Sequence, residues 1–264
     1  MSAMRLITLT TDFGLEDAYV GVLKGVILGI NPAATIVDVC HAIPPQDVRA
    51  AAFLLHTAWP YFPPGTIHVV VVDPGVGSQR RAIAVATEAA TFVAPDNGVL
   101  SYVLAEAAAK NTQAVHLTNQ RYWLPQVSAT FHGRDIFAPV AAHLSLGVPL
   151  ADLGEPLSLG ELVTFPLPRP ERQGDAWVGH VVHVDHFGNL VTDLEAEAIG
   201  DAQTVVIEVG GQRIVGLRRT YTEGTPGEPI ALIGSSGRLE IAVPGGHAAR
   251  WLQAQIGDQV RLKN

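Results

Sequence analysis

The 264-residue sequence has a single cysteine, Cys40, and no apolar run near the roughly 18 residues that a membrane-spanning helix needs. One cysteine excludes an intrachain disulfide and a four-cysteine zinc site. The first residues also lack the charged segment and the long apolar segment of a secretory signal peptide. We therefore expect a protein of the reducing cytoplasm without a membrane segment.

Basic residues are also scarce. Lys and Arg number 17 against 25 Asp and Glu, which gives a formal net charge of −8, and no Lys/Arg run occurs. Because nucleic acids and anionic membranes are bound by clustered positive charge, neither is an expected partner. Apolar residues make up 48% of the chain and charged residues 16%, so there is ample material for a folded core.

The first part of the chain, residues 1–165, alternates between strand-like and helical patterns. Strands are expected at 5–10, 35–39, 67–72, 82–86 and 91–94, and helices at 17–30, 46–58, 99–109 and 136–146. This order predicts an N-terminal α/β sandwich with a largely parallel sheet.

A proline-rich segment, residues 166–175, is typical of a linker because it holds Pro166, Pro168 and Pro170 before Gly174. The remaining residues, 176–264, contain short strand-like runs separated by glycine turns. These runs lie at 177–184, 190–193, 204–209, 212–215, 230–233, 239–243 and 259–262. Strands at this spacing predict a smaller C-terminal β-barrel domain.

Two aspartates follow the first expected strand. Asp12 stands just past its end, where ligands of open α/β sheets bind, and a carboxylate there can accept hydrogen bonds from a ribose diol. A local turn or a helix N-cap would explain Asp12 equally well. For Asp17, the residues by themselves favour an N-cap over a ligand contact.

Asp73 ends the buried run VVVVD and is followed by Gly75 and Gly77. The glycines match half of a dinucleotide-binding fingerprint, but the third glycine is missing and a strand follows where a helix is required. We interpret the segment as a turn that brings Asp73 and Arg80 together. In isolation such a pair is more often structural than catalytic.

Histidines offer one further candidate. His132 lies in a glycine-flanked loop before a helix, where it could handle a proton, or cap or pack the helix. His180 and His183 point to opposite faces of one expected strand, so a metal ion shared with His186 is not expected. Cys40-His41 is interpreted as packing.

Two polar turns interrupt the C-terminal strands. Residues 185–189 (DHFGN) form a hairpin loop by default, yet the loop could present Asp185, Asn189 and a stackable Phe to a ligand. Residues 234–237 (GSSG) form a second turn whose backbone N–H groups could approach a ligand, and Glu240 lies in the strand beside it.

Seven segments, in order along nearly the whole chain, together resemble one family. They are LTTDFGLEDAYVGVLKGVI, IVDVCHAIPPQDVRAAAFLL, VVVVDPGVGSQRRAIAV, APDNGVLSYV, ATFHGRDIFAPVAAHL, VDHFGNLVTDL and ALIGSSGRLEIAV. The set resembles the S-adenosyl-L-methionine (SAM) hydrolases that form adenosine, also called SAM hydroxide adenosyltransferases. That family is related to the SAM-dependent fluorinase and chlorinase. The resemblance implies an N-terminal α/β domain, a C-terminal β-barrel and a homotrimer whose sites lie at subunit interfaces.

The resemblance also implies roles for individual residues. A water-handling triad is implied at Asp73, Arg80 and His132, with Arg80 chosen over the adjacent Arg81 by spacing. Asp12 matches the carboxylate that holds the ribose hydroxyls. The methionine end is implied to meet Asp17, Asp185 and Ser235, and the adenosyl group to meet Asn189, Ser236, Glu240 and Val243. SAM is then the substrate, and no cofactor or metal ion is implied.

Departures from the halogenases indicate which reaction to expect. Gly133 stands where the fluorinase has its halide-binding serine, and Asp73 and Val76 stand where it has tyrosine and threonine; the fluorinase's inserted loop is not found. Gly234 departs from the asparagine of many relatives. We therefore expect hydrolysis of SAM to adenosine and L-methionine by in-line attack of an oriented water or hydroxide on ribose C5′. The alternatives are a non-catalytic SAM or adenosine sensor and a SAM-dependent halogenase.

Overall fold

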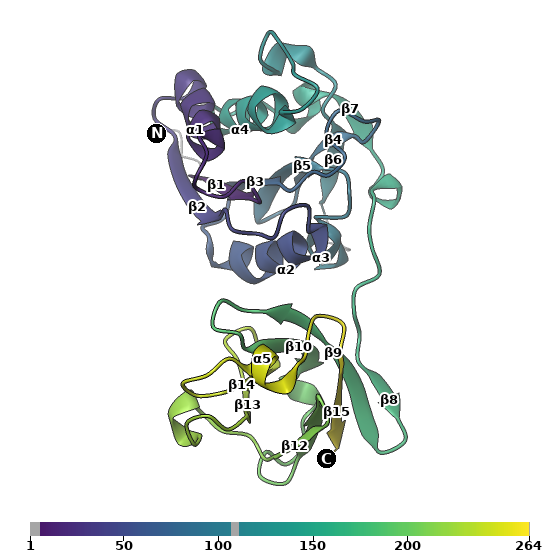
Figure 1. The fold of residues 1–264 in the computed structure, drawn as a ribbon. Helices are drawn as coiled ribbons and strands as arrows, with labels where there is room; N and C mark the ends of the chain where they lie inside the picture. The colour runs from purple at the N-terminus through teal and green to yellow at the C-terminus, as the bar shows by residue number, and fades with distance from the viewer. Residues whose placement is uncertain (1–5, 107–110, 264) are drawn as a thin grey trace. The chain divides into compact units, whose positions relative to one another are not determined.

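The computed structural model describes residues 6–106 and 111–263, and the chain divides into two compact units between Pro166 and Leu167 (Figure 1). Each unit has its own hydrophobic core. No helix in the described ranges is long and apolar enough to cross a membrane.

The N-terminal unit is built on a seven-stranded mixed sheet. Its order is β2 (Thr35–Cys40), β1 (Leu6–Thr11), β3 (Thr66–Val71), β5 (Ala90–Pro95), β4 (Ala82–Ala86), β6 (Gln113–His116) and β7 (Glu155–Leu157). The first four strands pair in parallel, and the pairings from β5 to β7 are antiparallel. The expected α/β class is confirmed, with β6 and β7 added to the expected strands.

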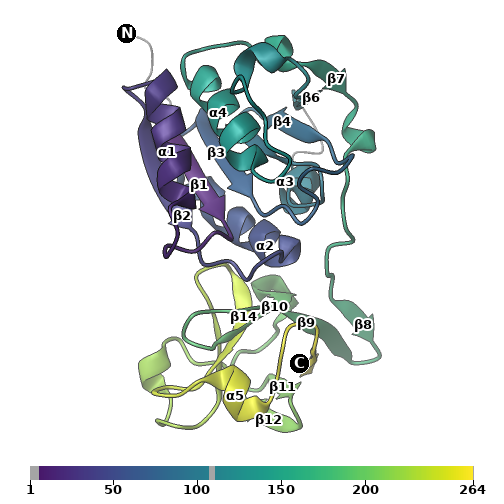
Figure 2. The ribbon, with the colours of Figure 1, turned by 45° about the horizontal axis from the view of Figure 1, so that its top comes forward.

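Helices cover both faces of this sheet. α1 (Tyr19–Ile30) and α4 (Ala138–Ser145) lie side by side on one face, and α2 (Val48–Ala58) and α3 (Ser101–Glu106) lie on the other (Figures 1 and 2). All six residues of β3 are buried for this reason, as the unbroken apolar run predicted. The expected helix at 99–109 extends beyond the described residues. The helix expected at 136 begins earlier, as a π-helical turn over Gly133–Phe137.

The C-terminal unit is an antiparallel, barrel-like sheet, as expected. Its order is β12 (Gln212–Val215), β11 (Val206–Val209), β15 (Gln259–Lys263), β9 (Ala176–Val184), β10 (Leu190–Glu195), β14 (Arg238–Ala242) and β13 (Ile230–Ile233). A short strand, β8 (Glu171–Gln173), pairs with β9 inside the segment expected to be a linker. The short helix α5 (Ala248–Leu252) was not expected from the sequence. Single 3-10 turns occupy Trp59–Tyr61, Gln120–Tyr122, Leu150–Leu153, Leu159–Glu161, Ala196–Ala198 and Tyr221–Glu223.

A buried histidine makes the stability of the fold depend on pH. His68 on β3 is 1% exposed, its Nδ1 lies 2.8 Å from Thr8 Oγ1, and burial lowers its pKa from 6.5 to about 4. Between those values the unfolded chain binds a proton that the folded chain does not, so stability falls as pH falls. We expect a loss of about 2–3 kcal/mol between pH 7 and pH 4.5 from this group.

Denaturant unfolding at the two pH values measures this loss. The glutamine in His68→Gln cannot titrate. The free energy of unfolding of this variant should therefore change less between pH 7 and pH 4.5, by about that amount. An identical pH dependence in the variant and the parent protein would contradict the assignment.

Candidate active site

Three parallel strands of the N-terminal unit end at one edge of the sheet. Thr11 at the end of β1 pairs with Val71 of β3, and Thr10 pairs with Cys40 of β2. The residues that follow these strands are His41, Asp12 and, two residues beyond Val71, Asp73. The structure therefore gathers their side chains at the carboxyl edge, where open α/β sheets bind ligands.

Arg80 joins Asp73 and His132 into one cluster. Its Nε donates to both carboxylate oxygens of Asp73, at 2.8 and 2.9 Å. Its Nη2 donates to Asp73 Oδ2 and, at 2.8 Å, to His132 Nδ1. The side chains of Asp73 and Arg80 are 6% and 9% exposed, so water screens this pair little. The expected turn does bring Asp73 and Arg80 together, and the neighbouring Arg81 instead pairs with Asp96.

The contact with Arg80 fixes the protonation state of His132. A guanidinium only donates, so His132 Nδ1 must accept and the ring proton resides on Nε2. Burial lowers the pKa of His132, the charge of Arg80 lowers it further, and Asp73 and Asp135 offset this only in part. His132 is therefore neutral at neutral pH and offers an N–H donor at Nε2. Its side chain makes no cap hydrogen bond to the helical turn that follows, which removes the capping alternative.

Asp12 and Asp17 differ in their surroundings. Asp12 is half-buried, and its Oδ2 accepts a hydrogen bond at 2.8 Å from the backbone N–H of Gln46, whose φ of 66° lies in the left-handed region. Asp17 is exposed, and the N-cap of α1 is Ala18, without a side-chain cap bond. The N-cap interpretation of Asp17 was therefore wrong.

Gly133 packs within an apolar wall next to His132. A Cβ on Gly133 would lie 3.4 Å from Phe13, Phe131 and Val71. Phe13, Phe131 and Tyr19 also pack against one another, with ring centroids 5.3 to 5.8 Å apart. This aromatic wall was not expected from the sequence, because its members come from three separate segments.

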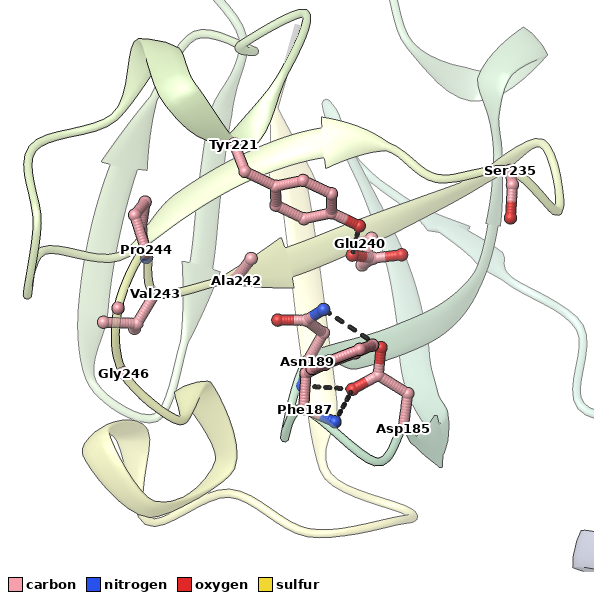
Figure 3. Close-up of a pocket in the computed structure, with 11 residues that line it drawn as sticks. Asp185, Phe187, Asn189, Tyr221, Ser235, Glu240, Ala242, Val243, Pro244 and Gly246 are labelled. Atoms are coloured by element: carbon pink, nitrogen blue, oxygen red, sulfur yellow. Dashed lines mark hydrogen bonds between the residues drawn. The ribbon is translucent and has the colours of Figure 1, made fainter.

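The C-terminal unit contains a pocket of about 580 Å³ (Figure 3). Five of the residues expected to hold substrate line it, namely Asp185, Asn189, Ser235, Glu240 and Val243. The remaining lining residues are Phe187, Tyr221, Ala242, Pro244, Gly245 and Gly246. Ser236 is exposed in the same turn as Ser235 but does not line the pocket.

One side of this pocket is a turn organised around Asp185. Its Oδ1 accepts from the backbone N–H groups of Phe187 and Asn189, at 2.9 and 2.8 Å, and its Oδ2 accepts from Asn189 Nδ2 at 3.0 Å (Figure 3). These bonds hold Asp185 and Asn189, while Phe187 between them is 72% exposed. The hairpin loop expected from the sequence is thus present, and it offers both a carboxylate and a ring to a ligand.

The other side of the pocket pairs Glu240 with Tyr221. The Tyr221 hydroxyl donates to Glu240 Oε1 at 2.6 Å (Figure 3). Burial raises the pKa of Glu240, and the nearby charge of Asp185 adds to this, although the bond from Tyr221 acts in the opposite direction. A Cβ at residue 234 would lie 2.5 Å from Glu240 Oε2, so a larger residue there would require the Glu240 carboxylate to shift. Tyr221 was missed because it lies in a short 3-10 turn without a sequence pattern.

A metal site was not expected from the sequence. Across residues 6–106 and 111–263, no group of three or more His, Cys, Asp or Glu side chains is arranged to hold a metal ion.

Comparison with known proteins places both units in one family. Residues 7–154 match the SAM hydroxide adenosyltransferase N-terminal domain, and residues 179–261 match the C-terminal domain. An (R)-S-adenosyl-L-methionine hydrolase from Thermus thermophilus is 43% identical, over 98% of this chain and all of its own. A fluorinase from an Actinoplanes species is 30% identical over 90% of both chains.

A solved structure agrees with these matches. A conserved protein from Thermotoga maritima superimposes with a TM-score of 0.91 at 37% identity, over 98% of this chain and all of its own. Both domain matches, the full-length relatives and the common fold lead to one assignment. The chain belongs to the SAM hydroxide adenosyltransferase family.

Proposed function

We propose that the protein hydrolyses SAM to adenosine and L-methionine by attack of a water molecule on ribose C5′. The observation that carries the proposal is the Arg80 fork, which holds Asp73 and His132 together at the carboxyl edge of the sheet. Membership of the family and full-length similarity to a protein named SAM hydrolase support the same reaction.

The chemistry of SAM explains what such a cluster must supply. The oxygen of water forms a bond to C5′ while the C5′–S bond breaks, and the electron pair of that bond goes to sulfur. Methionine leaves as a neutral thioether, so the leaving group needs no proton. Water, with a pKa of about 15.7, is a poor nucleophile. Holding it in line with C5′ and sulfur can contribute up to about 7–11 kcal/mol.

The three side chains divide this task in our proposal. His132 donates from Nε2 to the water oxygen and orients a lone pair toward C5′. Asp73 accepts the proton that the water loses, because a carboxylate retains free lone pairs after binding Arg80. Arg80 stabilises the developing hydroxide and fixes both neighbours.

The remaining expected residues would hold the substrate. Asp12 would accept hydrogen bonds from the two ribose hydroxyls, and Asp17, Asp185 and Ser235 would meet the methionine end. The adenosyl group would contact Asn189, Ser236, Glu240 and Val243, with Phe187 and Tyr221 offering ring faces to the base. The carboxylates of Asp185 and Glu240 suit a ligand that carries an ammonium and a sulfonium.

The cluster around Arg80 belongs to the N-terminal unit and the pocket belongs to the C-terminal unit, which bears on how subunits assemble. We propose a homotrimer in which one subunit's N-terminal unit and a neighbour's C-terminal unit complete each site. Light scattering should then give three times the mass of the chain, and a monomer with full activity would contradict this. The lone Cys40 is compatible with a reducing cytoplasm as its compartment.

Incubating the purified protein with SAM and separating the products by chromatography tests the proposal. Equal amounts of adenosine and methionine are expected, unchanged by EDTA. Recovery of intact SAM would favour a sensor, and chloride-dependent 5′-chloro-5′-deoxyadenosine would favour a halogenase. Neither Gly133 nor Val76 has a hydroxyl to bind a halide, so we expect none of the chlorinated product.

A further inference from the structure

His41 is buried beside the loop that carries Asp12, and its contacts go beyond packing. Its side chain is 3% exposed, and its Nδ1 lies 2.8 Å from Thr11 Oγ1. Its Nε2 lies 3.0 Å from Asp38 Oδ1, and Lys24 Nζ lies 2.6 Å from the other oxygen of Asp38. His41 therefore connects the end of β1 with β2 and, through Lys24, with α1.

The direction of the hydrogen bond between Thr11 and His41 follows from the donors available. The backbone N–H of Phe13 donates to Thr11 Oγ1 at 3.2 Å, so the Thr11 hydroxyl can direct its own proton to His41 Nδ1. The proton of a neutral His41 ring then resides on Nε2, facing Asp38. Burial raises the pKa of Asp38, but Lys24 and His41 outweigh this and lower it overall, so Asp38 stays charged.

The backbone of His41 holds the same loop from its other side. Its carbonyl oxygen accepts a hydrogen bond from Gly14 N–H at 2.7 Å. Thr11 and Gly14 flank Asp12, and both are bound by His41. The Asp12 carboxylate is further held by Gln46 N–H at 2.8 Å. Asp12 is thereby fixed by contacts on both sides and at its own oxygen before any ligand binds.

We propose that His41 is a positioning residue that pre-orders Asp12 for the two hydroxyls of a ribose. This inference rests on the ribose-binding role given to Asp12 in the proposed function. A carboxylate held in place loses little freedom on binding, whereas a mobile one must be ordered at the expense of affinity. The effect of His41 should therefore be limited to ligands that carry the diol.

The same strand offers a matched control. Thr8 and His68 form a second buried Thr–His pair, also at 2.8 Å, in the middle of β1 and away from its carboxyl end. Replacing His68 removes a buried histidine and its bond to threonine without altering the loop of Asp12. Replacing either histidine can lower stability. Only the replacement of His41 should alter how Asp12 is positioned.

The experiment measures binding of adenosine and of 2′,3′-dideoxyadenosine by calorimetry. We expect the parent protein to bind adenosine about 10- to 100-fold more tightly, since hydrogen bonds to a charged group are lost without the diol. His41→Ala and Thr11→Val should reduce this ratio to about threefold or less, while Thr11→Ser and His68→Gln should retain it. A ratio of two affinities does not depend on the fraction of folded protein.

Each result decides a different point. An unchanged ratio in His41→Ala and Thr11→Val, with strong discrimination by the parent protein, would overturn the positioning role alone. A parent ratio near one would overturn both that role and the ribose assignment of Asp12. If the parent discriminates and the variants do not, the inference is supported even where SAM is recovered intact and the hydrolase proposal fails.

Discussion

Arg80→Ala is expected to lower kcat for SAM hydrolysis by about 10³-fold while the dissociation constant of SAM changes less than about fivefold. The guanidinium binds both Asp73 and His132, so its removal frees both neighbours at once. It also removes the charge that stabilises a developing hydroxide. Single-turnover rates at saturating SAM, with affinity measured separately, give the two quantities.

Arg81→Ala is the matched control for the Arg80 experiment. Arg81 pairs with the buried Asp96, as Arg80 pairs with Asp73, so both variants should lose about 3 kcal/mol of stability or more. Only Arg80→Ala should lose turnover. Arg80→Lys should recover little, because an ammonium cannot reproduce the fork that reaches both partners. If Arg80→Ala turned over SAM as fast as the parent protein does, the catalytic role would be contradicted. An equal loss of turnover in Arg81→Ala would contradict it as well.

Gly188→Ala is expected to lower kcat/KM by about 100-fold through the pocket of the C-terminal unit. Gly188 has a φ of 85°, and a Cβ there would overlap the ring of His247. That ring cannot easily yield, because His247 caps α5 by accepting from Arg250 N–H and Ala249 N–H binds the Gly188 carbonyl at 2.9 Å. The turn bearing Asp185 must shift instead, and a displacement of about 1 Å can reduce turnover 10²-fold.

Gly211→Ala separates this overlap from the strain of the left-handed region. Gly211 has a φ of 73°, but nothing lies within 4 Å of the Cβ it would gain. The Gly211→Ala variant should lose about 1 kcal/mol of stability and keep the kcat/KM of the parent protein. Equal kinetic effects of Gly188→Ala and Gly211→Ala would show that the His247 contact does not hold the pocket.

Most strands could be predicted because their sequences are apolar and β-branched. The expected bounds of 82–86, 212–215 and 230–233 agree with β4, β12 and β13. The antiparallel pairing of β4 with β5 could also be predicted, because the segment between them is too short for the crossover that a parallel pair requires. β7 and β8 were missed because each is three residues long and is defined by its partner strand.

Some contacts of the site could likewise be predicted from local sequence, and others could not. A turn between Asp73 and Arg80 follows from local sequence, but the contact of Arg80 with His132 joins residues 52 apart and depended on family resemblance before the structure was known. The choice of Arg80 over Arg81 came from spacing within the family motif, and the structure pairs Arg80 with Asp73 and Arg81 with Asp96. His41 was interpreted as packing because its contact with Thr11 forms only when β1 and β2 pair, and its local contact with Asp38 matches no sequence motif.

The most direct test of hydrolysis at C5′ uses water enriched in oxygen-18. The protein is incubated with SAM in this water, and adenosine is analysed by mass spectrometry. One heavy oxygen should appear in the 5′-hydroxyl of adenosine, and methionine should carry none. Unlabelled adenosine, intact SAM, or methylthioadenosine formed with homoserine would contradict attack of water on ribose C5′.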